Sequence, residues 1–347
     1  MTEIASSENK PISQERLDLL RTAAGSGTVL ILTHDNPDPD SLASGKALAA
    51  LLKVGWRIPS RLVYFGLVAR AENREMLRLL APEWEHVVRL PSLKRYSSLA
   101  LVDTQPGSGN NQLPESADVQ IVIDHHLPVH ARTKNAVFWD VRPEAGATVS
   151  LVYQYLEAAG IVPGVDLATA MFYGIQADTR GLSRDSSPVD QAAYSKLWLS
   201  IDHQILAQVE QAGLPREYFR AMNRGLQAAY IYGSVVIAYI KRVPRPDFVG
   251  ELADLLIRLH GAHAVLCLGY YGKSMYLSLR TRPSNIDAGD LIQEIVSPLG
   301  KAGGHGTSAG GRLPLAGSRP DEVADQLERR FLSLMGEPST GKSLLLG

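Results

Sequence analysis

Three short apolar runs, each followed within two residues by an acid or a histidine, constrain most strongly how this chain can fold. The runs and the polar residues behind them are residues 29–32 with His34, residues 99–102 with Asp103, and residues 119–123 with Asp124. Apolar runs of this length are typical of parallel strands that are buried on both faces. The carboxyl ends of neighbouring parallel strands lie at one edge of a sheet. The sequence therefore predicts an α/β fold with a polar site at that edge.

The residues at this predicted edge are of the types that bind divalent metal ions. The candidates are His34, Asp38, Asp40, Asp103, His125, His126 and Asp178. A single His or Asp in a loop is usually a solvent-exposed residue without a function. The presence of such residues at the ends of three apolar runs indicates a functional site. Two prolines stiffen the segment 34–40, so Asp38 and Asp40 can bind different ions.

The charge of this set fits a pair of divalent ions. Its four aspartates carry −4, which two divalent cations balance. Asp103 ends the central run and is the natural ligand to bridge two ions about 3.5–4 Å apart. Carboxylates with a few imidazoles favour Mn²⁺ or Mg²⁺, although the histidines also admit Co²⁺, Fe²⁺ and Zn²⁺. We therefore expect hydrolysis of a phosphoester by a metal-activated water, and a fold that bound metal stabilises.

Residues 14–187 are expected to form a catalytic domain in which strands and helices alternate. Further strands are expected at residues 62–65 and 87–90, and helices at residues 41–53, 71–80, 148–159 and 166–177. The helix from residue 41 would begin beside the metal ligands, where its unpaired amides favour a bound anion.

A second, smaller α/β domain is expected at residues 233–335, joined to the first by a helical connector at residues 188–232. Its expected strands are residues 234–240, 264–270 and 275–280, and its expected helices are residues 247–260, 288–299 and 320–335. The active site is expected in the cleft between the two domains. Residues 336–347 are expected to be a flexible tail. Its segment 336–343 fits the P-loop pattern, but no predicted strand precedes it, so we interpret the match as chance.

Composition excludes several classes of protein. The 35 basic and 36 acidic residues give a net charge of −1, which argues against a bulk electrostatic hold on long duplex nucleic acid. No apolar stretch approaches the roughly 20 residues that span a bilayer, and residues 1–10 lack the apolar segment of a secretory signal. We therefore expect a cytoplasmic protein without a membrane partner. Its one cysteine, Cys267, lies in an apolar run, where a buried thiol is expected.

Four segments resemble, in order and spacing, the four motifs of the DHH phosphoesterase superfamily. They are His34-Asp35-Asn36-Pro37-Asp38-Pro39-Asp40-Ser41, Asp103-Thr104, Asp124-His125-His126 and Gly174-Ile175-Gln176-Ala177-Asp178-Thr179. The glycine-rich segment 303–311 resembles the signature of the DHHA1 domain. The overall likeness is to the compact bacterial nano-RNase and phosphoadenosine-phosphate phosphatase type of this RecJ-like superfamily.

The resemblance implies a role for each candidate ligand. The two ligand sets, each around one Mn²⁺, would be His34, Asp38 and Asp103, and Asp40, Asp103, His125 and Asp178, with Asp103 as the bridge. His126 matches the family position beside the scissile phosphate, where it would stabilise charge or donate a proton to the leaving oxygen. The segment 146–148 also resembles a family segment, for which we expect only a structural role.

The resemblance also implies that the second domain binds the rest of the substrate. The matching positions are Arg280, Gly303, Gly304, His305 and Gly306. An arginine suits a terminal phosphate, and glycines let the backbone approach a ligand closely.

Together these inferences predict a two-metal phosphoesterase that converts short 5′-phosphorylated oligonucleotides to nucleoside monophosphates, with 3′,5′-bisphosphate nucleotides as a further candidate substrate. Three alternatives stay open: a phosphodiesterase for cyclic dinucleotides or their linear products, an inorganic pyrophosphatase or exopolyphosphatase, and a non-catalytic nucleotide-binding regulator. The complete ligand set argues against the regulator. Cleavage polarity, base preference and oligomeric state, for which a homodimer is one candidate, are not determined by the sequence.

Overall fold

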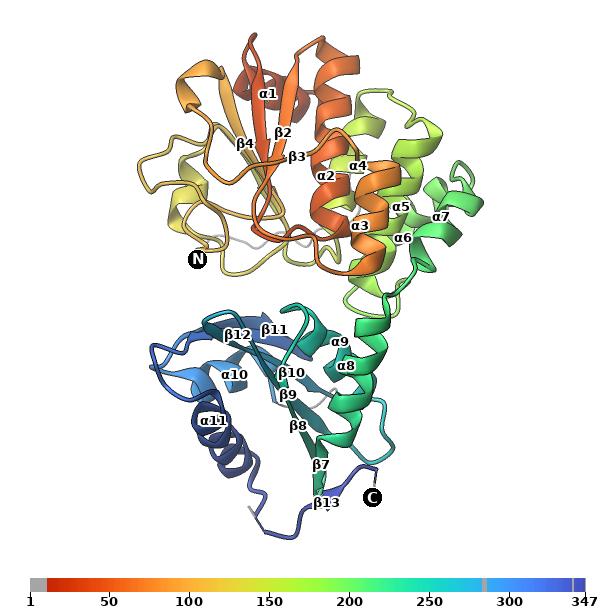
Figure 1. Cartoon of the computed structure of the whole chain (residues 1–347). Helices are drawn as coiled ribbons and strands as arrows, with labels where there is room; N and C mark the ends of the chain where they lie inside the picture. The colour runs from red at the N-terminus through yellow and green to blue at the C-terminus, as the bar shows by residue number, and fades with distance from the viewer. Residues whose placement is uncertain (1–10, 283–285, 339, 347) are drawn as a thin grey trace. The chain divides into compact units, whose positions relative to one another are not determined.

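The computed structural model describes residues 11–282, 286–338 and 340–346, without the side chain of His305 (Figure 1). The chain divides into two compact units, Met1–Ala212 and Gly213–Gly347, each of which is described by itself. Residues 1–10, on which the expected absence of a secretory signal depends, lie outside the described residues. None of the helices in the described ranges is long and apolar enough to cross a membrane.

The first unit contains a sheet of parallel strands, as predicted. They are β1 (Val29–Leu32), β2 (Ser60–Tyr64), β3 (Glu85–His86), β4 (Ser98–Val102), β5 (Ile121–Asp124) and β6 (Phe138–Val141). Their order is β3-β2-β1-β4-β5-β6, so the chain builds one half of the sheet outward from β1 and then returns to build the other half from β4. A ligand site is expected at the carboxyl ends of β1 and β4, where the order reverses.

Helices cover one face of this sheet and loops cover the other. The helices are α1 (Gln14–Ala24), α2 (Pro39–Ala50), α3 (Ala71–Leu80), α4 (Thr148–Ala158), α5 (Val165–Thr179), α6 (Pro188–Trp198) and α7 (His203–Glu210). A turn of π-helix (Leu51–Gly55) continues α2, and two 3-10 turns lie at Leu93–Arg95 and Ala131–Asn135. Val29 and Ile31 of β1 pack among the helices. Leu30 and Leu32 pack on the opposite face, which explains why this strand shows no alternation.

The second unit is built on a mixed sheet with helices on both faces. Its strands are β7 (Ala229–Tyr232), β8 (Val235–Arg242), β9 (Ala264–Tyr271), β10 (Ser274–Thr281), β11 (Lys301–His305), β12 (Ser308–Pro314) and β13 (Ser343–Leu344), in the order β11-β12-β10-β9-β8-β7-β13. Among the described strand pairs of this second sheet, β8 and β9 are parallel and the others are antiparallel. Helices α10 (Ala288–Val296) and α11 (Pro320–Met335) pack on one face. Helices α8 (Arg216–Gln227) and α9 (Phe248–Leu256) pack on the other, where Cys267 is buried as a free thiol.

The region expected to be a helical connector is divided between the two units. Helices α6 and α7 belong to the first unit, α8 belongs to the second, and residues 229–232 form β7. An amphipathic pattern shows that a helix packs on a core, but it does not show on which core. β7 follows α8 without a break in the apolar pattern, so its start is not visible in the sequence.

Other segments also differ from the sequence prediction. α1, β6, β11 and β12 are not predicted, and β3 lies at Glu85–His86 rather than at residues 87–90. The tail expected to be flexible contains β13, which pairs with β7, and Glu337, which accepts hydrogen bonds from the backbone N–H and hydroxyl of Ser234. In the described part of residues 336–343, α11 ends and β13 begins, an order opposite to the strand-to-helix order of a P-loop.

Candidate metal centre

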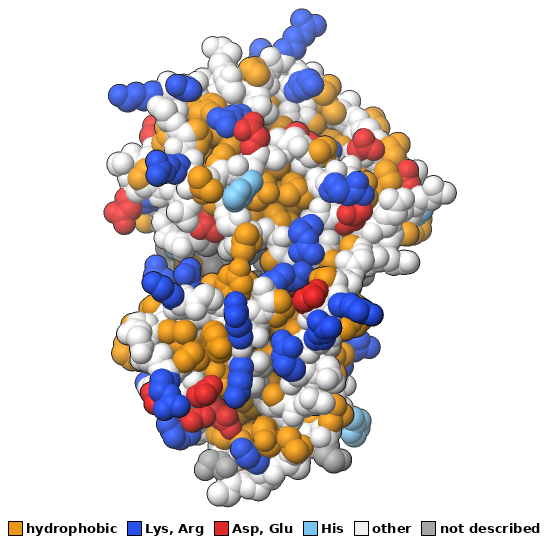
Figure 2. All heavy atoms as spheres, viewed as in Figure 1, with side chains coloured by type: hydrophobic (Ala, Val, Ile, Leu, Met, Phe, Trp, Pro, Cys, Tyr) orange, Lys and Arg blue, Asp and Glu red, His pale blue; other side chains and the backbone are white. Residues whose placement is uncertain are grey.

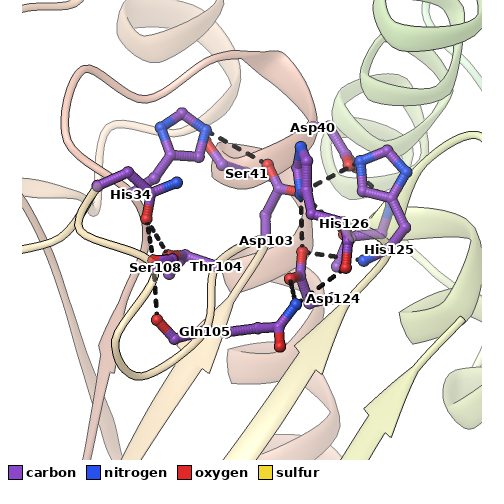
Figure 3. Close-up of polar contacts among 12 residues, drawn as sticks. His34, Asp40, Ser41, Asp103, Thr104, Gln105, Ser108, Asp124, His125 and His126 are labelled. Carbon is purple, nitrogen blue, oxygen red and sulfur yellow. Dashed lines mark hydrogen bonds and ion pairs between the residues drawn. The ribbon is translucent and has the colours of Figure 1, made fainter. Parts of the chain in front are cut away.

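The predicted metal ligands come together at the carboxyl ends of β1, β4 and β5. Figure 3 shows four of them, His34, Asp40, Asp103 and His125. The contributing elements are β1 with His34 behind it, the start of α2 with Asp38 and Asp40, β4 with Asp103, β5 with His125 and His126, and the last turn of α5 with Asp178. Gly174 lets α5 pack closely on α2, because a Cβ there would lie only 3.2 Å from the carbonyl oxygen of Pro39. This packing brings residues from distant parts of the chain to one edge of the sheet.

Asp103 lies at the centre of the site. Its Oδ2 is 3.4 Å from His34 Nε2, and its Oδ1 is 3.6 Å from His125 Nε2. The side chain is 1% exposed, and the backbone has φ of +58°, in the left-handed region that costs a non-glycine residue energy. Strain of this kind collects at functional sites, and here it accompanies a carboxylate that faces two histidines.

Two further contacts complete two sets of ligand atoms. His34 Nε2 lies 3.8 Å from Asp38 Oδ1, and His125 Nε2 lies 3.5 Å from Asp178 Oδ2. Three groups have ligand atoms within 4.8 Å of one another: His34 with Asp38 and Asp103, Asp40 with His125 and Asp178, and Asp103 with His125 and His126. The six predicted ligands therefore lie in groups that share Asp103 or His125.

Backbone carbonyls orient the two histidines that face Asp103. Nδ1 of His34 lies 3.0 Å from the carbonyl oxygen of Asp35, and Nδ1 of His125 lies 3.0 Å from that of Ala145. Since a carbonyl can only accept, each Nδ1 carries a proton and donates it. In the neutral ring this leaves the lone pair on Nε2, which points at the carboxylates and is the atom that would bind a metal.

The residues present fit a divalent metal. Asp103 Oδ2 and His125 Nε2 are buried and have no hydrogen-bond partner among the described residues. A buried polar atom left in this state costs about 1–3 kcal/mol, and both atoms are of a kind that binds a cation. Carboxylate oxygens with imidazole nitrogens form a donor set suited to Mn²⁺ and related ions.

Burial and mutual repulsion affect the four carboxylates unequally. Burial raises the pKa of Asp40 and of Asp178 well above the usual value, and the charges of neighbouring aspartates raise both further. Burial also opposes ionisation of Asp38 and Asp103, but the pKa of each is lowered overall: at Asp38 by His34 and the backbone N–H of Ser41, and at Asp103 by His34 together with the charges of His126 and His125. Bound cations would favour the ionised form of all four.

His126 is more open than the other histidines of the site, with a side chain that is 41% exposed. Its Nδ1 donates to Asp124 Oδ1 at 2.8 Å and lies 3.6 Å from Asp103 Oδ1. Although burial opposes the charged form, the hydrogen bond to Asp124 and the nearby carboxylates raise the pKa of His126 to about 9. The imidazole is therefore protonated at neutral pH and can meet an anionic ligand.

Two residues that hold His126 in place are absent from the predicted site: Asp124 and Gln105. Asp124 is fully buried, and its Oδ2 accepts a hydrogen bond from Gln105 Nε2 at 2.7 Å. The same Nε2 donates to the carbonyl oxygen of His126 at 2.9 Å, and Gln105 Oε1 accepts from the hydroxyl of Thr133 at 2.9 Å. Asp124 is visible in the sequence motif. Gln105 carries no signal beyond its place two residues after the central aspartate.

Arg280, predicted to face the substrate, is held within the second unit. Its Nε donates to Asp254 Oδ1 at 2.6 Å, and its Nη1 donates to Ser278 Oγ at 2.8 Å and to two backbone carbonyls. The side chain is only 12% exposed. Among the described residues Nη2 forms no hydrogen bond, so this group alone remains for a further partner.

The predicted glycine signature forms the hairpin of β11 and β12. Gly303 and Gly304 lie in β11, and Gly306 lies in the turn with φ of +56° and donates its N–H to Asp287 Oδ2 at 2.6 Å. A Cβ built on Gly303 or Gly306 would meet no described atom within 4 Å, so a ligand can approach the backbone there. His305 belongs to β11, but its side chain lies outside the described residues.

Comparison with known sequences identifies similarity in both units. The model of the DHH family, N-terminal domain, matches residues 28–175, and that of the DHHA1 domain matches residues 232–333. The uncharacterized protein MJ1633 of Methanocaldococcus jannaschii is 34% identical over 289 residues, which cover 83% of this chain and 58% of the relative. A probable manganese-dependent inorganic pyrophosphatase of Streptococcus agalactiae is 25% identical over 151 residues, 44% of this chain and 48% of that protein. The chain thus spans about half the length of these relatives.

Comparison with solved structures supports the fold. An exopolyphosphatase-related protein from Bacteroides fragilis superposes with a TM-score of 0.77 at 15% identity, over 97% of this chain and 99% of that chain. RecJ from Thermus thermophilus, in complex with Mn²⁺, superposes with a TM-score of 0.54 at 13% identity, over 93% of this chain and 54% of that chain. At such low identity the likeness concerns the fold alone.

Proposed function

Because the chain belongs to the DHH family and carries a DHHA1 domain, we propose that it is a metal-dependent phosphoesterase acting on short 5′-phosphorylated oligonucleotides. The products are nucleoside monophosphates, and 3′,5′-bisphosphate nucleotides are a further candidate substrate. One observation carries the proposal. Asp103 divides its two oxygens between His34 and His125, which is the placement required of a carboxylate that bridges two cations.

Two divalent ions, with Mn²⁺ as the best match to the donor set, are proposed for this site. The residues that would hold them are His34, Asp38 and Asp103 on one side, and Asp40, Asp103, His125 and Asp178 on the other. When bound, such ions activate water as a nucleophile and stabilise the charge of a phosphate. The four aspartates balance two divalent charges, so the filled site can accept an anionic ester.

His126 is proposed to bind the scissile phosphate and to protonate the leaving oxygen. Its raised pKa keeps the ring protonated at neutral pH, and its exposure lets a substrate reach it. Nδ1 donates its proton to Asp124 Oδ1 at 2.8 Å, so Nε2 is the atom proposed to donate to the leaving oxygen. Gln105 holds Asp124 from the other side. A general acid has to be held in a fixed orientation so that its proton lies within hydrogen-bond reach of the leaving oxygen.

The second unit is proposed to bind the nucleotide part of the substrate. Residues 213–347 carry 16 Lys and Arg against 12 Asp and Glu, a net charge of +4 that favours anionic ligands. On the face shown in Figure 2, its basic side chains lie dispersed among hydrophobic and uncharged ones. The open space beside the backbone of Gly303 and Gly306 lets a ligand approach closely, with Gly304, His305 and the Nη2 group of Arg280 as further candidate contacts.

Hydrolysis of pyrophosphate is the second candidate. It is favoured by the likeness over 151 residues to a protein named as a probable manganese-dependent inorganic pyrophosphatase. A cyclic-dinucleotide phosphodiesterase would use the same metal ligands. The non-catalytic regulator is the weakest candidate, because all six predicted metal ligands are present and lie together.

A chromatographic time course with Mn²⁺ tests these assignments. The substrates are a 5′-phosphorylated RNA dinucleotide, a 3′,5′-bisphosphate nucleotide, a cyclic dinucleotide and pyrophosphate. Asp103→Asn removes the bridging charge, and Asp166→Asn, at an exposed aspartate in the first turn of α5, is the matched control. We expect mononucleotide release from the linear dinucleotide that Asp103→Asn abolishes and Asp166→Asn preserves.

Other outcomes distinguish the alternatives. Faster turnover of pyrophosphate or of the cyclic substrate, lost in Asp103→Asn, would retain the metal centre and replace the substrate class. Absence of turnover on all four substrates would leave the nucleotide-binding regulator as the better proposal.

A further inference from the structure

The N-terminus of α4 contacts two of the predicted metal ligands. The backbone N–H groups of Thr148 and Val149 donate to Asp40 Oδ2 at 2.7 Å and to Asp40 Oδ1 at 2.8 Å. The hydroxyl of Thr148 donates to Asp103 Oδ1 at 2.9 Å. The N-cap residue of α4 is Ala147, which has no side chain able to cap the helix. Asp40 of α2 takes that role, and the Thr148 hydroxyl remains for Asp103.

These contacts are shielded from water and rigidly placed. Thr148 and Asp40 are fully buried, and Asp103 is 1% exposed, so water cannot replace the hydroxyl. The turn before α4 is anchored by Asp190, whose Oδ2 accepts the N–H of Gly146 at 2.7 Å. The hydroxyl of Thr148 is therefore held at one point relative to the carboxylate of Asp103.

We propose that Thr148 is a positioning residue of the metal centre, whose hydroxyl sets the orientation of the Asp103 carboxylate between His34 and His125. This inference deepens the proposed function and rests on the metal site of that function. Rotation of an aspartate carboxylate about its last torsion angle is weakly restricted, so a hydrogen bond is needed to fix it. The Thr148 hydroxyl occupies one lone pair of Oδ1 and leaves the others for cations.

Thr148 contacts Asp103 through its side chain, whereas it contacts Asp40 through its backbone. The contact with Asp103 can therefore be removed by substitution without removing the backbone contacts at the start of α4. The backbone N–H groups that bind Asp40 are the same whatever the side chain is. Thr148→Val keeps the branched shape and removes the hydroxyl, whereas Thr148→Ser keeps the hydroxyl. Thr169→Val makes the same change at another fully buried threonine, whose hydroxyl donates to the Val165 carbonyl at 2.7 Å, away from the predicted ligands.

The test is a calorimetric titration of the full-length, metal-free protein and of these variants with Mn²⁺, together with kcat and KM on the substrate found for the wild type. Loss of a residue that orients a metal ligand weakens metal binding by about 10- to 100-fold. We expect this loss in Thr148→Val, a recovery of most of the affinity in Thr148→Ser, and wild-type affinity in Thr169→Val. The turnover at subsaturating Mn²⁺ should follow the same order.

Several outcomes would overturn the inference. Wild-type Mn²⁺ affinity in Thr148→Val would do so, and so would a failure of Thr148→Ser to recover affinity, since packing rather than the hydroxyl would then matter. If Thr148→Val does not fold, Thr148→Ala against Thr148→Ser gives the same comparison, because that pair differs only in the hydroxyl. A wild type that binds Mn²⁺ but hydrolyses no phosphoester would remove the proposed function, while the affinities would still decide on Thr148. A wild type that binds no Mn²⁺ would overturn both.

Discussion

Asp103 Oδ2 lies 3.4 Å from His34 Nε2, although the two residues follow different strands and are separated along the chain by helices α2 and α3 and by strands β2, β3 and β4. β1 and β4 are neighbours in the sheet because the strand order reverses between them. The ligand centre therefore depends on the topology of the sheet. It also depends on the left-handed backbone conformation of Asp103. A substitution at this position keeps the site intact only if the new residue adopts the same conformation.

Removal of metal should destabilise the protein. Four buried or partly buried aspartates repel one another without cations, and burial together with this repulsion raises the pKa of Asp40 and of Asp178. A ligand present at about 100 times its Kd stabilises a fold by about 2.7 kcal/mol. We expect Mn²⁺ to raise the Tm by several degrees and EDTA to reverse the change, as measured by differential scanning calorimetry. An equal Tm with and without Mn²⁺ would contradict the assignment of the site.

The stability of the metal-free protein should fall as the pH rises from about 6.5 to about 9. The folded pKa of His126 is about 9, whereas an unfolded histidine has a pKa of about 6.5. A group that binds its proton more tightly when folded contributes stability below its unfolded pKa, and this is lost as the pH passes the folded pKa. Denaturant unfolding in EDTA across this range measures the effect. His126→Gln should reduce the dependence without abolishing it, because contacts with Asp103 and Asp38 also raise the pKa of His34 despite its burial. A stability that rises with pH would be inconsistent with these raised pKa values.

Loss of Gln105 should impair catalysis more than metal binding. Its amide donates to Asp124 and to the carbonyl of His126, and its oxygen accepts from Thr133. Gln105→Leu leaves these buried groups without partners, which costs about 1–3 kcal/mol for each. We expect a lower Tm and a fall in kcat of about 10- to 100-fold, with Mn²⁺ affinity close to that of the wild type. Gln211→Leu, at an exposed position, is the control, and an unchanged kcat in Gln105→Leu would exclude the role.

Gly146→Ala should destabilise the fold where Gly164→Ala does not. A Cβ at Gly146 would lie 2.6 Å from the carbonyl oxygen of Asp185 and 2.7 Å from Thr179 Cγ2, so the backbone before α4 must shift. Overpacking of this kind costs about 1–3 kcal/mol. A Cβ at Gly164 would meet no described atom within 4 Å. Urea unfolding of both variants measures the difference, and equal stabilities would contradict the tight packing of this turn.

Much of the metal centre could be predicted from the sequence because its signals are local. Each ligand lies within a few residues of a strand or helix end, and apolar runs mark those ends by composition alone. Helices α3 and α11 have the predicted bounds, since each combines a helical apolar period with a recognisable start or stop. The ligand types also limit the chemistry, because carboxylates and imidazoles restrict the ions that can bind.

Other features depended on contacts between distant segments, which no local pattern encodes. Whether α6, α7 and α8 pack on the first or the second core is decided by burial in three dimensions. β13 has only two residues and forms because β7 offers an unpaired edge. The three bonds from the start of α4 to Asp40 and Asp103 join residues more than 40 positions apart. The sequence by itself determined the identity and order of the metal ligands. Only the tertiary structure decided what holds them, because hydrogen bonds in a buried site depend on where the fold brings each donor.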